Sequence, residues 1–471
     1  MTPEEPRRPH VAVIGGGIAG LAAAWELVRS ADAPRVTVLE GSAHCGGKLA
    51  VGEIAGVSVD EGAEQVLLRR PEAVTLLAEL GLADQLVHPA TSAAGVLVER
   101  RLRPLPPRTL LGVPTDLRAL RRSRVIGAAA VARARLEPLV PGRAPSEDVA
   151  VGPYLRSRLG APVVDRLVEP LLGGVYAGRA DLLSLAATMP QLWSALQGRR
   201  SVIRAAQSVL PVNGRGAPEP VFGSLPGGLA HLVRPLLEAL AAAGAQVRTS
   251  AVVREIVRTP DGWRITVGPT RTPERIDADA VVVAVPGRPA SRLLGGLGEP
   301  GLSGAAARLG GVDYASIALV TLAFDRLALR GSGFLVPPAE GRAVKAATFT
   351  SVKWGRPGAS VVRLSYGRHG EEADLQREDA ELVRLAVSDL AEITGATGGL
   401  LDARVVRWGG GLPQYAPGHL DLVASLRAAL AGLPTLAVAG AAYDGVGVPA
   451  CIGSGRAAAR SVLAGLGRLG D

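Results

Sequence analysis

The chain has few aromatic residues, few cysteines and almost no lysine. Aromatic residues make up 3% of its 471 residues, so its cores must be built mainly from Ala, Val and Leu. Only Lys48, Lys345 and Lys353 among its 52 basic residues are lysines. This bias toward arginine is broad, so most arginines need no functional explanation, whereas the three lysines merit inspection. Cys45 and Cys451 form neither a metal-type spacing nor a redox CxxC pair, and a chain of this size does not need a disulfide scaffold.

Long apolar runs and targeting signals are also lacking. No run approaches the roughly 18–20 apolar residues that a membrane span requires. The first ten residues, MTPEEPRRPH, lack the charged-then-apolar order of a secretory signal. The six histidines are scattered, so no metal site is predicted. We therefore expect a cytoplasmic protein, soluble or peripheral on the inner face of the cell membrane. Its length and its 48% hydrophobic content fit a globular enzyme with two or three packed regions.

Positive charge is concentrated in one segment. Residues 100–143 contain eleven arginines and two acidic residues, which accounts for the whole net charge of +9. Such a block is often a solvated face, and it can also face an anionic membrane or an acidic substrate. No nucleic-acid-binding motif accompanies it, so we expect no nucleic-acid partner.

A glycine-rich turn follows the first apolar strand. The turn Gly15-x-Gly17-x-x-Gly20 lies between a strand expected at 10–14 and a helix expected at 18–30. The first glycine permits a sharp turn, the second lets a pyrophosphate approach the backbone, and the third lets the helix pack on the strand. Glu40 ends a second strand, where a carboxylate can bind a ribose diol. This segment predicts a dinucleotide site without separating FAD from NAD.

Two further glycine turns favour FAD. The sequence GGK at 46–48 follows Glu40 by six residues, and DEGA at 60–63 follows a short strand expected at 57–59. An extended FAD runs past such turns in flavoenzymes, whereas NAD requires neither of them. Each turn alone is an ordinary loop. Their order after the dinucleotide turn is what favours a flavin.

The far end of the chain has a similar pattern. A strand expected at 435–439 is followed by Gly440, by DGVGVP at 444–449 and by a helix expected at 452–464. The N-terminus of that helix would stabilise negative charge on a reduced flavin. An ordinary glycine turn before a helix explains the local sequence equally well. The order of elements along the chain implies a nucleotide domain assembled from separated segments.

Together these motifs resemble the bacterial protoporphyrinogen and coproporphyrinogen III oxidases, within the FAD superfamily that also contains monoamine oxidases and phytoene desaturases. The resemblance covers almost the whole chain. Two motifs are specific to the porphyrinogen oxidases, namely LVEPLLGGVYAGRADLLSL at 167–185 and GLPQYAPGHL at 411–420. The other matching motifs are VIGGGIAGLAAAWEL at 13–27, CGGK at 45–48, SLPGGL at 224–229 and YDGVGVPACIGSGRAAA at 443–459.

The resemblance implies an α/β fold, α+β overall. It would combine a glutathione-reductase-type, Rossmann-like FAD domain with an antiparallel-sheet substrate domain and a helical insertion that contacts the membrane. The discontinuous FAD-binding domain would comprise residues 8–90, 221–300 and 400–471. Residues 91–210 would form the helical region for substrate and membrane contact, and 301–399 the substrate-binding sheet.

The resemblance also implies cofactor-binding residues, position by position. Two departures bear on side chains but not on the backbone: Cys45 stands where relatives usually have Leu, and the turn at 62–65 reads GAEQ instead of GPDS. The ADP end would be bound by Gly15, Gly16, Gly17, Ile18, Ala19, Gly20, Glu40 and Gly41, with Val253 near the adenine. The middle of FAD would pass Gly47, Lys48, Gly62, Ala63, Glu64 and Gln65, and the flavin end would lie near Trp408, Gly440, Val446, Gly447 and Val448.

The implied reaction is oxidation of coproporphyrinogen III to coproporphyrin III in haem biosynthesis. Three two-electron steps would pass electrons through FAD to oxygen and release hydrogen peroxide. The substrate propionates require basic partners. Arg69, Arg70, Arg179 and Lys353 are candidates, although each arginine is also explained as a surface residue. No catalytic side chain is predicted, and a ferrochelatase is the expected downstream partner.

Several alternatives remain open. Protoporphyrinogen IX is a second candidate substrate. An amine oxidase or carotenoid desaturase of the same superfamily is another, although amine oxidases favour an aromatic cage and aromatics are scarce here. A non-catalytic protein that handles FAD or haem is a third. Cys451 could carry a covalent flavin, as in some amine oxidases, but non-covalent binding is expected. The basic segment 100–143 corresponds to the membrane-contacting region of the family, which implies weak binding to anionic lipid.

Overall fold

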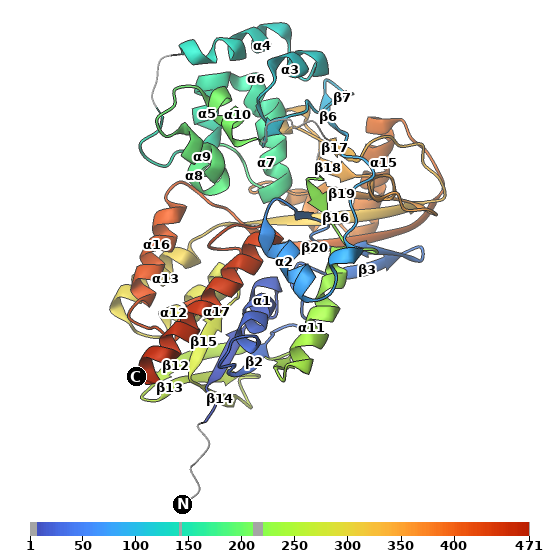
Figure 1. The fold of residues 1–471 in the computed structure, drawn as a ribbon. Helices are drawn as coiled ribbons and strands as arrows, with labels where there is room; N and C mark the ends of the chain where they lie inside the picture. Colours follow the sequence, from blue (N-terminus) through green and yellow to red (C-terminus); the bar gives the residue numbers. More distant parts are fainter. Residues whose placement is uncertain (1–6, 141–143, 211–219, 471) are drawn as a thin grey trace, which may run out of the picture.

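The computed structural model describes residues 7–140, 144–210 and 220–470, and three regions follow one another along the molecule (Figure 1). A parallel sheet lies at the end that holds both chain termini. A mostly antiparallel sheet lies in the middle, and a helical region forms the opposite end. The polar, Gly- and Pro-rich sequence at 207–220 predicts a loop, and most of it lies outside the described residues.

The parallel sheet contains five strands in the described part of the chain, in the order β11–β2–β1–β15–β21. β1 is central and pairs in parallel with β2 and β15. All its residues are buried, as expected for a parallel strand covered on both faces. The predicted βαβ opening is therefore confirmed. The strands are β1 (His10–Ile14), β2 (Arg35–Leu39), β11 (Gln246–Arg248), β15 (Ala280–Val283) and β21 (Leu436–Val438).

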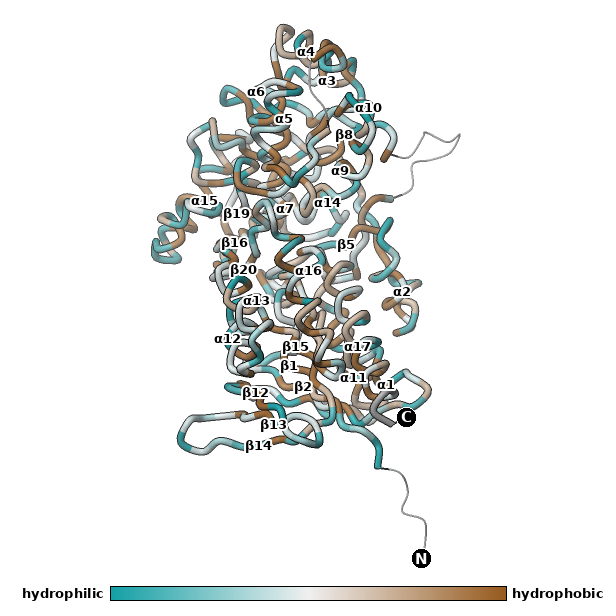
Figure 2. Tube along the Cα trace, turned by 90° about the vertical axis from the view of Figure 1, so that its left-hand side faces the viewer, coloured by the Kyte–Doolittle hydropathy of each residue, from teal (hydrophilic) through white to brown (hydrophobic). Residues whose placement is uncertain are grey.

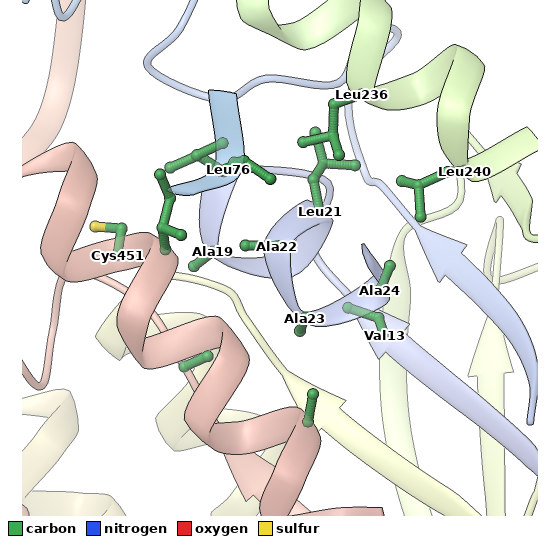
Figure 3. Close-up of a cluster of buried hydrophobic side chains, with 14 of the residues drawn as sticks. Val13, Ala19, Leu21, Ala22, Ala23, Ala24, Leu76, Leu236, Leu240 and Cys451 are labelled. Atoms are coloured by element: carbon green, nitrogen blue, oxygen red, sulfur yellow. The ribbon is translucent and has the colours of Figure 1, made fainter. Parts of the chain in front are cut away.

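The first and last helices pack side by side against this sheet. Figure 3 shows the small side chains of α1 (Ile18–Val28) beside α17 (Val448–Gly470), which carries Cys451. The approach is close, since a Cβ at Gly455 of α17 would lie 2.0 Å from the carbonyl oxygen of Ala19. This packing brings glycine turns from both ends of the chain to the same edge of the sheet. Helices α2 (Pro71–Glu79) and α11 (Val233–Ala242) complete the core on this face.

The hydrophobic residues of this region follow the sheet and its covering helices, as the hydropathy of β1, β15 and α17 shows in Figure 2. The other face of the parallel sheet packs on α12, α13 and α16 and on a three-stranded antiparallel sheet. The helices are α12 (Gly287–Gly295), α13 (Pro300–Gly310) and α16 (His419–Leu430), and the strands are β12 (Val253–Thr259), β13 (Gly262–Val267) and β14 (Glu274–Ala278).

The sequence at 247–257 predicts a single strand, but this segment forms two strands in two different sheets, β11 and β12. The chain turns between them at Ser250, whose φ of +53° lies in the left-handed region. Three short two-stranded pairs complete the strands of the described residues. They are β3 (Val51–Ile54) with β4 (Val57–Asp60), β5 (Val66–Leu67) with β10 (Phe222–Gly223), and β8 (Thr109–Leu110) with β9 (Val113–Pro114).

The middle sheet has seven strands among the described residues, in the order β20–β16–β19–β18–β17–β6–β7. All neighbours are antiparallel except β17 and β6. Helix α15 (Asp379–Thr394) packs on one face of this sheet. The strands are β6 (Ala94–Val98), β7 (Arg101–Pro104), β16 (Tyr314–Phe324), β17 (Gly333–Leu335), β18 (Val344–Thr348), β19 (Ser360–Tyr366) and β20 (Leu400–Pro413).

This sheet extends beyond the range 301–399 expected for it. Residues 400–413 were assigned to the FAD domain, but they form β20, which pairs with β16 along most of its length. Residues 94–104 were assigned to the helical region, but they form β6 and β7 at the other edge. The strand pairing corrects both boundaries, because ladder hydrogen bonds join segments that are distant in sequence.

The helical region has its own core, and its helices are shorter than expected. The Arg- and Ala-rich sequence at 116–136 predicts a single helix, but the helix is broken at Arg124, where φ is +56°. The sequence at 152–172 also predicts a helix, and this one is interrupted at Gly160. That second segment passes through a π-helical turn and continues beyond Gly173–Gly174 to Tyr176. The elements are α3 (Leu117–Ser123), α4 (Ala128–Arg135), α5 (Val151–Leu159), α6 (Ala161–Val163), π-turn η3 (Val164–Val168), α7 (Glu169–Tyr176), α8 (Leu185–Thr188), α9 (Pro190–Leu196) and α10 (Val202–Val209).

The remaining helical elements are short. In the described residues, no helix has both the length and the apolar character needed to cross a membrane. The short elements are α14 (Thr350–Trp354) and the 3-10 turns η1 (Ala83–Gln85), η2 (Glu137–Leu139), η4 (Leu229–Leu232), η5 (Pro338–Glu340) and η6 (Ala373–Gln376).

Candidate cofactor and substrate site

The glycine turn lies at the carboxyl end of β1, and its glycines meet different constraints. Gly15 has a φ of +111°, and a Cβ there would lie 2.5 Å from the carbonyl oxygen of Ala284. A Cβ at Gly20 would lie 1.9 Å from the carbonyl oxygen of Gly15, so the fold itself requires both residues. A Cβ at Gly17 would meet nothing within 4 Å. Open space beside the first turn of α1 is what a pyrophosphate needs.

The carboxylate of Glu40 lies across this turn. Its Oε2 accepts the backbone N–H of Gly16 at 2.7 Å, and its Oε1 accepts that of Ser42 at 2.7 Å. A carboxylate oxygen can accept more than one hydrogen bond, so both oxygens can still bind ribose hydroxyls. The N–H of Gly46 donates to the carbonyl oxygen of Gly16 at 2.8 Å, which joins the GGK turn to the glycine turn.

The turns at 46–48 and 60–63 also contact each other. The N–H of Ala63 donates to the carbonyl oxygen of Lys48 at 3.0 Å, and a Cβ at Gly62 would lie 2.0 Å from that oxygen. The protein therefore requires glycine at 62 for its own packing. Asp60 accepts the N–H groups of Leu229 and Ala230 at 3.0 and 2.9 Å, which fastens the SLPGGL segment here. Burial raises the pKa of Asp60 to about 6.

The side chain of Lys48 reaches residues from the far end of the chain. Its Cε lies 3.8 Å from where a Cβ of Gly411 would be, and the Cys451 thiol lies close enough to influence its charge. Burial lowers the pKa of Lys48, and no acidic residue of the described chain forms an ion pair with it. The indole N–H of Trp408 donates to the carbonyl oxygen of Glu61 at 2.7 Å. The structure thus brings together residues that were expected near the middle of FAD and near its flavin ring.

The loop before α17 completes this edge of the site. Gly440 and Gly445 have φ values of +123° and +129°, and a Cβ at Gly440 would meet nothing within 4 Å. Helix α17 begins at Val448, directly after Val446 and exposed Gly447. The free N–H groups and partial positive charge of a helix N-terminus favour an anionic partner.

Glu64 and Gln65, expected along FAD, have different environments. Glu64 is buried in an ionic cluster, where Arg363 lies at 2.7 Å and Lys353 at 3.2 Å. Desolvation acts against ionisation, but Arg363 and Lys353 lower the pKa of Glu64 overall. The Oε1 atom of Gln65 is buried without a hydrogen-bond partner in the described residues. Buried acceptors are normally satisfied, so this atom fits a ligand that donates a hydrogen bond.

Three of the candidate substrate cations pair with acidic residues of the protein. Arg70 precedes α2 and pairs with Glu72 at 3.4 Å, and Arg69 is exposed. Arg179 pairs with Glu371 at 3.5 Å and lines a pocket of about 120 Å³, which is too small for a tetrapyrrole ring. Lys353 pairs with Glu64 instead of facing an open cavity. The expectation that these residues bind propionates stays a prediction.

Sequence analysis missed the residues that join the two porphyrinogen-oxidase motifs. Asp148 accepts the hydroxyl of Ser184 at 2.6 Å and the N–H of Gly418 at 3.1 Å, one partner from each motif. Gln414 donates through Nε2 to the carbonyl oxygen of Tyr176 at 2.8 Å, again from motif to motif. Gln414 was inside a matching motif, whereas no local pattern marked Asp148.

A dinucleotide turn, an acid at the next strand and a second glycine loop at the far end define a flavin-dependent oxidoreductase. The model of the flavin containing amine oxidoreductase family matches residues 18–463, so the chain belongs to that family. The expected flavin cofactor and oxidoreductase class are thereby confirmed.

Similar proteins extend over nearly the whole chain. Coproporphyrinogen III oxidase of Mycobacterium tuberculosis (strain ATCC 25618 / H37Rv) is 38% identical over 461 residues, covering 96% of this chain and 97% of its own. Protoporphyrinogen oxidase of Macaca fascicularis is 30% identical over 497 residues, covering 96% and 98%. A crystal structure from Exiguobacterium sp. 255-15 superimposes with a TM-score of 0.84 at 31% identity, covering 96% and 98%.

Proposed function

We propose that this protein oxidises coproporphyrinogen III to coproporphyrin III in haem biosynthesis, with oxygen as electron acceptor and hydrogen peroxide as by-product. The proposal rests mainly on one observation: hydrogen bonds of Asp148 and Gln414 connect the two porphyrinogen-oxidase motifs, 167–185 and 411–420. The connected motifs lie beside the loop that leads into α17. The 38% identity to a coproporphyrinogen III oxidase supports this substrate over protoporphyrinogen IX. A ferrochelatase would take up the porphyrin product.

FAD fits the residues present, and in this proposal the domain is of the glutathione-reductase type. Gly17 leaves space for the pyrophosphate, Glu40 offers acceptors to the ribose, and Gln65 offers a buried acceptor. When bound, FAD supplies the two-electron chemistry of each oxidation step. The chain supplies placement and charge: the ammonium group of Lys48 and the N-terminus of α17 give this end of the site a positive potential. Such a potential favours any reaction that accumulates negative charge there.

The test uses both porphyrinogens, prepared without oxygen, in side-by-side assays of the purified holoprotein. Porphyrin fluorescence and oxygen consumption are followed together, and three oxygen molecules should be consumed for each porphyrin formed. We expect coproporphyrinogen III to be oxidised faster. Equal rates would contradict the substrate preference, and absent turnover would favour a non-catalytic FAD- or haem-handling protein. Peroxide release from a panel of amines would instead favour an amine oxidase.

The tip of the helical region, α3 and α4, is proposed to bind an anionic membrane surface from the cytoplasmic side. Arg118, Arg121, Arg122, Arg124 and Arg135 are exposed there. Two apolar residues beside them, Leu136 and Leu139, are 54% and 78% exposed. Arg143 lies outside the described residues. Each basic residue near an anionic surface contributes about 1 kcal/mol, and two apolar side chains add contact with lipid.

Liposome flotation at low salt tests the membrane proposal. The Arg121→Glu/Arg122→Glu protein should float less with anionic vesicles than the wild type. The matched control is Arg271→Glu/Arg275→Glu, which changes the charge equally on exposed residues of the parallel-sheet end. Equal flotation of both variants would contradict the assignment of α3 and α4 as the contact surface.

A further inference from the structure

The hydroxyl of Tyr415 closes the loop that precedes α17. It donates a hydrogen bond to the carbonyl oxygen of Ala441 and accepts the backbone N–H of Gly445 at 3.0 Å. Tyr415 is only 1% exposed. One buried hydroxyl therefore satisfies a polar group at each end of the segment 441–445, which begins just after β21 and ends just before the residues expected at the flavin.

The ring of Tyr415 is held from the other side by α16 and by the helical region. His419 stacks on it with ring centroids 3.9 Å apart and planes 14° apart, and the ring of Tyr176 lies 5.9 Å away at 58°. The carbonyl oxygen of Tyr415 accepts the N–H of Ser184 at 2.7 Å. Tyr415 thus contacts α7, α16, the segment that leads into α8 and the loop before α17 at the same time.

Loop 441–445 has further anchors at Asp444, whose carboxylate accepts hydrogen bonds from Arg427 at 2.7 Å to both of its oxygens. The hydroxyl of Ser454 on α17 donates to Asp444 at 2.8 Å and accepts the N–H of Gly440 at 3.2 Å. Gly445 has a φ of +129°, so the chain direction into Val446 depends on how this glycine is held. Tyr415 and Ser454 hold the loop from its two sides.

We propose that Tyr415 is a positioning residue for the cofactor, which holds loop 441–445 so that the backbone of Gly445–Val448 keeps its place at the flavin end of the site. The proposal rests on the flavin site described above and adds to it a residue outside the glycine motifs. Its effect is carried by the hydroxyl and not by the ring, because a phenylalanine would fill the same space. The phenylalanine would leave the Ala441 carbonyl and the Gly445 N–H without their buried partner, and the loop would shift to satisfy them.

Tyr176 provides a matched control. Its ring belongs to the same buried aromatic group, but among the described residues its hydroxyl donates only to the carbonyl oxygen of Thr188, at 3.5 Å. Tyr176→Phe therefore removes a hydroxyl from the same cluster without touching loop 441–445. Any difference between the two phenylalanine variants reports on the loop.

The experiment compares wild-type, Tyr415→Phe and Tyr176→Phe holoproteins. FAD affinity of the apoproteins, the flavin absorption spectrum and midpoint potential, and the KM and kcat for coproporphyrinogen III are measured. We expect Tyr415→Phe to weaken FAD binding about tenfold and to alter the flavin spectrum and potential, with KM changed less than twofold. Tyr176→Phe should keep the wild-type FAD affinity and spectrum. Wild-type flavin properties in Tyr415→Phe, or the same losses in both variants, would overturn the proposal.

Failure of this proposal is distinguishable from failure of the proposed function. FAD affinity, spectrum and potential need no porphyrinogen, so they test Tyr415 even if the wild type oxidises neither substrate. Should Tyr415→Phe be recovered unfolded, Ser454→Ala tests the same loop from its other side. Weaker FAD binding in Ser454→Ala would support the role of the loop, and unchanged binding would overturn it.

Discussion

The Glu40 carboxylate accepts the backbone N–H of Gly16 at 2.7 Å, which ties the acid at the end of β2 to the glycine turn after β1. Its second oxygen accepts the N–H of Ser42 at the same distance. Both oxygens therefore face donors before any ligand is considered. Position 40 needs a group with two acceptors, which a carboxylate provides and a carboxamide does not.

Glu40→Gln should weaken FAD binding about 10- to 100-fold. The amide NH₂ would have to face one of the two N–H donors, so a hydrogen bond worth about 1.5–3 kcal/mol is lost and the turn is disturbed. FAD titration of the apoprotein measures the effect. Glu53→Gln, an exposed residue of β3, is the control and should bind FAD normally. Similar FAD affinity for both variants would mean that Glu40 does not organise the ribose site.

Gly17→Ala and Gly20→Ala should both yield protein without bound FAD, but for different reasons. A Cβ at Gly17 meets nothing within 4 Å, so the alanine protein should fold but lose FAD, because the methyl group occupies space left for the pyrophosphate. A Cβ at Gly20 lies 1.9 Å from the Gly15 carbonyl oxygen, so that variant should be recovered poorly or unfolded. Circular dichroism and bound-flavin absorbance separate the two results. A folded Gly17→Ala protein with full flavin content would contradict this account of the turn.

The first βαβ unit and the glycine turns could be predicted because their causes are local. A buried strand, small residues at fixed spacing and an acid after the next strand all lie within residues 10–40. The boundaries of the middle sheet could not be predicted, because β6 and β20 join it through pairing with segments far along the chain. The break at Arg124 was also hidden, since a left-handed φ at a non-glycine residue has no clear local signal.

At the candidate site, contacts between side chains that are distant in sequence explain which residues could not be predicted. Lys353 was a candidate because the substrate propionates require basic partners, but its partner in the structure, Glu64, is 289 residues away. Asp148 was missed because its partners, Ser184 and Gly418, come from two distant motifs. Both cases depend on contacts that exist only after folding, which composition and spacing do not contain.

Lys353→Met should lower stability more than it affects substrate binding. Removing this lysine leaves Glu64 buried with Arg363 and Trp354 as its remaining partners, and loss of one partner from a buried ionic group costs about 3–5 kcal/mol. Urea unfolding of the holoprotein measures the loss. In the double variant Glu64→Gln/Lys353→Met the loss should be smaller than the sum of the two single effects. A large rise in KM at unchanged stability would instead support the original assignment of Lys353 to the substrate.

Lys345→Met should stabilise the protein, most strongly at and below neutral pH. Lys345 is 6% exposed, donates to the Gly367 carbonyl oxygen at 2.8 Å and forms no ion pair with an acidic residue in the described chain. Burial, with a further contribution from Arg368, lowers its pKa to about 7.

The unfolded chain has a lysine pKa of about 10.4, so between pH 7 and that value it binds a proton that the folded protein does not. The contribution of Lys345 to the stability of the wild type therefore rises with pH across this window and is least favourable below pH 7. Methionine removes the charge, so the stability gain of the variant should be greatest at pH 6. This gain should shrink by up to about 1.4 kcal/mol per pH unit above pH 7, as urea unfolding at pH 6 and pH 9 would show.

Lys345→Arg keeps the charge and should not be stabilising at either pH. A gain for Lys345→Met that is independent of pH would show that lost packing or altered hydrogen bonding, and not the buried charge, governs this position.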